Sequence, residues 1–73
     1  MTREKAIRIQ GIYKDLKFAK FAMKGHLNEI DLLMDEYDRK GMFLSYRRLV
    51  DYREDQQTQM DIIEEAIAVL QIQ

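Results

Sequence analysis

The side chains with catalytic potential are few and lie far apart along the chain. His26 is the only histidine, and an imidazole that titrates near neutrality suits a general base or a pH switch. Ser45 is the only serine, and it lies about one helix length from His26 if the intervening residues are helical. A serine–histidine pair is therefore not expected, and the sequence predicts no enzyme and no catalytic residues.

Three aspartates recur at helical spacing and are the candidates for a metal site: Asp31, Asp35 and Asp38. Carboxylate sites in helical bundles point inward and include Glu-x-x-His pairs. These aspartates are instead expected opposite the apolar side of their helix. No phosphate-binding glycine loop, zinc-ligand spacing or nucleotide fingerprint occurs in the chain. We therefore expect a solvated acidic face, with no metal and no cofactor.

The stretch from Lys14 to Lys24 is the most informative, because lysines and phenylalanines share one helix face there. Exposed aromatic patches usually mark protein interfaces, and small residues let another helix approach closely. Cations beside aromatic rings also suit phosphates and unpaired bases. We expect a protein interface, self-association included, with nucleic-acid binding as the alternative. The predicted partner-binding residues are Lys14, Lys17, Phe18, Phe21, Ala22, Lys24, Gly25 and Leu32.

The elements that must position these residues are two long helices. Apolar residues recur at seven-residue spacing in two adjoining rows, which we call the seam: Ile9, Leu16, Met23, Ile30 and Tyr37, and Tyr13, Leu27 and Met34. Such a repeat is typical of a helix packed along another helix, and it keeps its phase through Gly25. The sequence predicts one helix over 3–40, a turn over 41–43 and a second helix over 44–71. Thr58 before Asp61 resembles a helix cap, so a break near residue 57 is the alternative.

The two predicted helices fold back on each other if the chain reverses at Gly41. The residue numbers of facing positions then add up to about 84, and the basic stretch around Lys20 faces the acidic residues around Glu64. His26 comes level with Gln56 and Gln59, and we predict that these three form a polar layer in the seam that fixes the register. The fold class is therefore all-α, an antiparallel helical hairpin.

Length and composition indicate that this hairpin self-associates. A single domain of 73 residues rarely buries a sufficient core, and the absence of cysteine rules out disulfide support. Two hairpins would complete a homodimeric four-helix bundle with a coiled-coil-like core. The charged N-terminus does not resemble a signal peptide and no run of residues suits a membrane span, so we expect a cytoplasmic location and no membrane partner.

In architecture, a dimer of such hairpins resembles the Rop family of plasmid copy-number proteins. That resemblance implies RNA binding through the basic face of the first helix, although no motif of that family aligns with this sequence. From the residues themselves we predict a small regulatory protein that acts by binding another protein, as an adaptor, inhibitor or chaperone-like module. A small nucleic-acid-binding regulator is the alternative.

Overall fold

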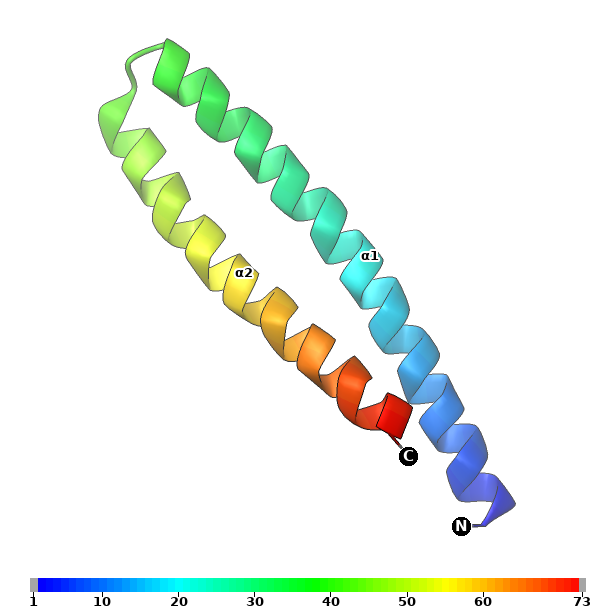
Figure 1. The fold of residues 1–73 in the computed structure, drawn as a ribbon. Helices are drawn as coiled ribbons and strands as arrows, with labels where there is room; N and C mark the ends of the chain where they lie inside the picture. Colours follow the sequence, from blue (N-terminus) through cyan, green and yellow to red (C-terminus); the bar gives the residue numbers. More distant parts are fainter. Residues whose placement is uncertain (1, 73) are drawn as a thin grey trace.

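The computed structural model describes residues 2–72, with Ile72 described by its backbone alone, and within this range the chain forms two antiparallel helices (Figure 1). Helix α1 spans Arg3–Arg39 and helix α2 spans Phe43–Ile72. The hairpin is a rod of 57 × 15 × 14 Å. Both helices begin and end within one residue of the bounds expected from the heptad pattern. None of the described helices contains a stretch long and apolar enough to cross a membrane.

Helix α1 begins at a side-chain cap. Thr2 has an extended backbone, and its hydroxyl oxygen accepts a hydrogen bond of 3.3 Å from the backbone N–H of Lys5. This bond satisfies one of the N–H groups that have no partner in the first helical turn. Glu4 places a negative charge at the positive end of the helix dipole. Sequence and local electrostatics therefore agree on where α1 starts.

The turn is a Schellman motif centred on Gly41. The N–H of Gly41 donates to the carbonyl of Asp38 and the N–H of Met42 donates to that of Tyr37, so two terminal carbonyls of α1 are satisfied. Gly41 has φ of 69°, a left-handed conformation that side chains disfavour. The next helix starts at once, because the carbonyl of Met42 already accepts from the N–H of Tyr46.

Helix α2 is continuous across its polar middle. The break considered near residue 57 is absent, because Thr58 does not cap a new helix. Its hydroxyl donates instead to the carbonyl of Glu54, one turn earlier, over 3.1 Å. No proline or glycine occurs between residues 43 and 72 to interrupt the backbone hydrogen bonds.

The core lies along the seam and is small. Among the described residues, four hydrophobic side chains are buried: Leu27, Ile30, Met60 and Ile67. Met23, Met34 and Leu49 pack around the first three of these and are partly buried. Two hydrogen-bonded pairs, Tyr13 with Gln71 and Asp31 with Arg53, fit the predicted facing register. The helical hairpin and its register are thus confirmed, and its seam buries only a narrow strip.

Candidate interaction surfaces

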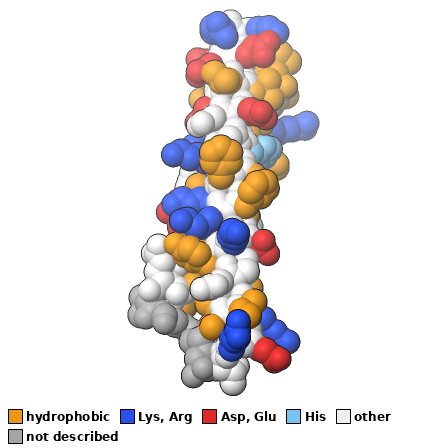
Figure 2. Space-filling model, turned by 90° about the vertical axis from the view of Figure 1, so that its right-hand side faces the viewer, with side chains coloured by type: hydrophobic (Ala, Val, Ile, Leu, Met, Phe, Trp, Pro, Cys, Tyr) orange, Lys and Arg blue, Asp and Glu red, His pale blue; other side chains and the backbone are white. Residues whose placement is uncertain are grey.

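The outward side of α1 carries the residues that were predicted to bind a partner. We call Lys14, Lys17, Phe18, Phe21 and Lys24 the lysine–phenylalanine surface. Phe18 and Phe21 are 76% and 78% exposed, and Leu32, further along α1, is 69% exposed. Ala22 and Gly25 are exposed between them. Figure 2 shows this side of the rod, with orange hydrophobic side chains set among blue lysine and arginine side chains along its middle.

The lysines of this surface have little intramolecular compensation. Lys20 and Glu64 line the same groove between the helices, as their predicted register requires. The ion pairs found among residues 2–72 are nevertheless elsewhere, at Lys40–Glu36 and Arg53–Asp31. Lys17 places its ammonium 5.0 Å from the centre of the Tyr13 ring, a cation–π contact. Within the described hairpin the lysines of this stretch therefore form no ion pair, and Glu64 lowers their positive potential only on the flank of the groove.

Tyr13 joins the two helices near their open end. The side-chain amide of Gln71 donates to its hydroxyl oxygen over 3.0 Å. This hydrogen bond, with a smaller contribution from Lys17, lowers the pKa of the Tyr13 phenol from its ordinary value. The contact fixes the C-terminal turns of α2 beside the start of the lysine–phenylalanine surface.

A second surface lies between the helices on another side of the hairpin. It is an apolar groove of about 450 Å³, lined by Ile12, Leu16, Ile62, Glu65, Ala66, Val69 and Leu70. Ile12, Ile62 and Val69 are each more than half exposed. A single charged residue, Glu65, lies among these apolar side chains. The groove therefore leaves a continuous apolar strip in water, which is costly unless something covers it.

His26 lies further along the same side as the groove and contacts Tyr52. Its Nε2 is 3.0 Å from the Tyr52 hydroxyl oxygen, and the two rings meet edge to face with centroids 5.8 Å apart. The predicted layer of His26 with Gln56 and Gln59 is not formed by hydrogen bonds within the described hairpin. Gln56 is partly buried at the seam, and Gln59 is exposed. The polar partner of His26 inside one chain is therefore Tyr52.

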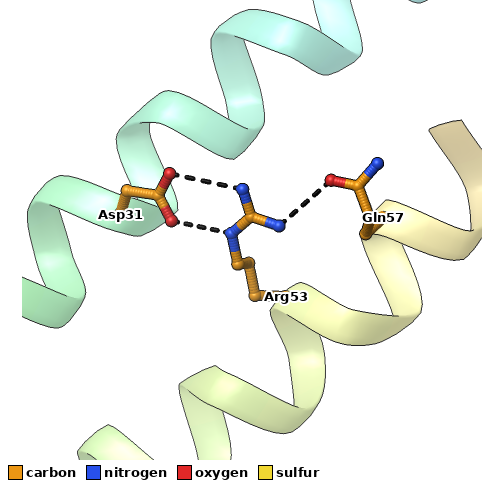
Figure 3. Close-up of polar contacts among 3 residues, drawn as sticks. All are labelled: Asp31, Arg53 and Gln57. Atoms are coloured by element: carbon orange, nitrogen blue, oxygen red, sulfur yellow. Dashed lines mark hydrogen bonds and ion pairs between the residues drawn. The ribbon is translucent and has the colours of Figure 1, made fainter.

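The polar middle of α2 is held by an ion pair across the hairpin (Figure 3). The guanidinium of Arg53 donates to both carboxylate oxygens of Asp31, over 2.7 and 3.3 Å. It also donates to Gln57 over 3.1 Å, and Gln57 donates in turn to Asp61. The hydrogen bonds from Arg53 hold the pKa of the Asp31 carboxyl below its ordinary value, and the carboxylate raises that of Arg53.

The expectation that Asp31 lies opposite the seam is wrong. It lies at the edge of the seam, because the facing register brings it level with Arg53 and a bidentate pair follows. Asp35 and Asp38 are exposed. Within residues 2–72, no three histidine or acidic side chains are grouped as metal ligands would be.

Sequence reasoning missed three features of these surfaces. The residue numbers of Asp31 and Arg53 add up to the predicted value for facing positions. Applying that rule to every charged residue would have found the pair. The His26–Tyr52 contact joins positions beside the seam, which a search for apolar rows passes over. Phe43 and Leu44, at the turn, are 83% and 78% exposed, and no pattern in the sequence marks them as more exposed than their neighbours.

Comparison of the chain with protein-family models, curated proteins and solved structures finds no match.

Proposed function

We propose that this chain is a non-enzymatic protein-interaction module that self-associates through its apolar groove into a homodimeric four-helix bundle. The outward side of α1 is left free in that assembly to bind another protein. The observation that carries the proposal is the groove itself, in which Ile12, Ile62 and Val69 stand more than half exposed next to the seam.

The energetics of a two-helix hairpin support self-association. Four buried hydrophobic side chains among the described residues are few for a rod 57 Å long. Burial of apolar side chains is the main favourable contribution to folding, and the loss of conformational entropy is the main opposing one. A second hairpin laid on the groove would bury a further row of apolar side chains from each chain. A four-helix bundle is the common solution to this imbalance.

The chemistry of the groove favours a second copy as its occupant. Its lining is almost wholly apolar, as the core of a homodimer interface is. Its lining includes the partly buried Leu16 of α1 and Leu70 of α2, so two grooves pressed together would join the cores of the two hairpins into one. Ala66 gives the small contact surface at which another helix can approach closely.

Replacing a groove residue by a charged one tests the proposal. We expect Val69→Glu to lower the solution mass of the protein, measured by sedimentation equilibrium at micromolar concentration, because each dimer would bury two unpaired carboxylates. Leu44→Glu is the matched control, since Leu44 is exposed at the turn and away from the groove. The control should keep the wild-type mass. A wild-type protein that is a stable folded monomer would refute self-association.

Nucleic-acid binding is the second candidate for the outward side of α1. The observation that favours it is the set of exposed lysines outside the described ion pairs, next to two exposed phenylalanine rings. Phosphate contacts by Lys14, Lys17 and Lys24 would make binding of single strands fall with salt, by roughly 0.7 decades per decade of salt for each contact. Submicromolar binding at physiological salt that is lost in the triple glutamine variant would make this candidate primary.

A protein partner predicts a different response. Truncating Phe18 or Phe21 to alanine would then cost about 1–3 kcal/mol of association free energy each. Neutralising the lysines would change mainly the association rate. We favour this outcome because Glu64, on the facing helix, lines one groove with Lys17, Lys20 and Lys24 and lowers the positive potential on that flank.

A further inference from the structure

One heptad column on the outward side of α1 alternates between no side chain and a large one. It contains Gly11, Phe18, Gly25 and Leu32, seven residues apart, on the side of α1 opposite the seam. Phe18 and Leu32 are 76% and 69% exposed. A Cβ built on either glycine meets nothing within 4 Å. No contact inside the hairpin therefore explains why glycine, a poor helix former, stands at these two places.

We propose that this column binds the same column of a second copy, with the two α1 helices antiparallel and a two-fold axis between Phe21 and Ala22. Phe18 and Gly25 are equally far from that axis, and so are Gly11 and Leu32. In this arrangement Phe18 of each chain packs over Gly25 of the other, and Leu32 packs over Gly11. Large side chains thus fill the spaces that the glycines leave, as knobs fill holes in coiled coils.

The symmetry of the arrangement is that of an isologous dimer, in which the same patch of both chains meets itself. The two Phe21 rings lie next to the axis on one flank, where two aromatic rings can pair. The two Ala22 methyl groups lie next to it on the other flank and permit close approach. A parallel pairing would instead set Phe18 against Phe18 and Gly25 against Gly25, with overcrowding at one level and a void at the other.

The charges of α1 also favour the antiparallel direction. Residues 1–24 carry seven Lys or Arg and two acidic residues, whereas residues 25–38 carry five acidic residues and no Lys or Arg. Antiparallel packing sets each basic half along the acidic half of the other copy. It brings Glu4 level with Arg39 of the second copy on the central column. On one flank it brings Arg8 near Glu36, which outweighs one like-charged pair between Asp15 and Glu29 only together with the attraction between the two halves. Long-range attraction of this kind steers association and fixes direction.

This inference rests on the proposed function in taking the outward side of α1 as a protein-binding surface, and it identifies that protein as a second copy of this chain. It does not depend on the groove, which lies between the helices on a different side of the hairpin. A chain with both faces intact would assemble beyond a dimer, whereas a chain that carries Val69→Glu would stop at the α1–α1 dimer.

The test is a complementation experiment between two variants, Phe18→Gly and Gly25→Phe, each made in a chain that also carries Val69→Glu. In a dimer of the first variant, the space over each Gly25 is left empty. In a dimer of the second, the phenylalanine at position 25 of each chain collides with Phe18 of the other. Each variant alone should therefore dissociate at least about 30-fold more readily than its parent, the factor for losing a 2 kcal/mol contact. An equimolar mixture can form mixed dimers. In these, one chain has phenylalanine at both positions 18 and 25 and the other chain has glycine at both, so each phenylalanine again faces a glycine. We expect the mixture to regain the dimer mass of the Val69→Glu parent in sedimentation equilibrium.

The matched control is Leu44→Gly, which removes an equally exposed side chain away from the column and should leave the parent's dimer mass unchanged. Circular dichroism follows folding in every sample, and a variant that loses helix alone but regains it on mixing also supports the inference. A mixture that dissociates as readily as its separate components would overturn it, as would an unchanged mass in the Phe18→Gly chain. Failure of the groove proposal would give a different result: the Val69→Glu variant would have the same solution mass as the wild-type protein.

Discussion

The Asp31–Arg53 pair makes a quantitative prediction, because it is the one ion pair between the two helices in the described part of the chain. The side chains of Arg53 and Asp31 are 30% and 49% exposed, so water screens the pair in part. Exposed pairs contribute about 0.2–1 kcal/mol. The two-point geometry places this one toward the upper end, and we expect a coupling energy of about 1 kcal/mol.

A double-mutant cycle measures that coupling. Asp31→Ala, Arg53→Ala and the double variant would be unfolded in urea at one fixed protein concentration, because self-association changes the apparent free energy of unfolding. The coupling should shrink at 1 M salt, where charges are screened within about 3 Å. The control cycle uses Glu36 and Lys40, a local pair 2.8 Å apart within one helix and its cap, which should couple more weakly.

A coupling energy indistinguishable from zero at low salt would refute this account of the polar middle of α2. Arg53 would then be a polar residue that the hairpin accommodates between its helices, and its pairing with Asp31 would contribute nothing to the free energy of unfolding. The double change Asp31→Leu with Arg53→Met separates stability from specificity further. It should leave the free energy of unfolding unchanged or higher, since apolar replacement of a whole ion pair is often neutral or stabilising.

Three further predictions concern pH, the turn and His26. Because folding lowers the pKa of Asp31, its contribution is full above the unfolded value of about 3.9 and is lost as the pH falls through the lower folded value. Urea titrations of wild type and Asp31→Asn should therefore begin to converge below about pH 4 and coincide below the folded pKa, and a constant difference would contradict this. Gly41→Ala should cost about 1–2 kcal/mol, because alanine would have to adopt the positive φ of 69°, and a thermal melt that matches wild type would show that the turn relaxes. His26→Leu should keep or raise the melting temperature while making the assembled mass less uniform in sedimentation, whereas a large loss of stability with unchanged mass would contradict a specifying role.

The fold could be predicted from the sequence because its main determinants are local or periodic. The seam rows and Gly41 indicate where α1 lies and where it ends, and the basic stretch around Lys20 opposite the acidic residues around Glu64 indicates the reversal. The side-chain pairs next to the seam could not be predicted in the same way. His26 contacts Tyr52 rather than Gln56 or Gln59, because a long side chain at the edge of a helix pair reaches a partner by its rotamer and not by its level alone.

The candidate surfaces were only partly predictable for a related reason. Exposure of Phe18 and Phe21 follows from their heptad position opposite the seam, and the structure confirms it. The apolar groove depends on how far α2 covers the flank of α1. As a result Ile12 is exposed and Leu16 is partly buried. How far one helix covers the other depends on how the two pack, so it cannot be read from the sequence of α1 or of α2 alone.

The tight turn at Gly41 also shapes how the hairpin forms. Contacts beside the turn close short loops and cost little chain entropy, whereas the Tyr13–Gln71 contact closes most of the chain. The two helices are therefore expected to join progressively from the turn toward the open end. The first turns of α1 extend past the end of α2 (Figure 1), so they have less of the facing helix beside them than the rest of α1 has. Amide hydrogens should accordingly exchange with solvent along a gradient, slowest around Leu27 and Ile30 and fastest before Tyr13.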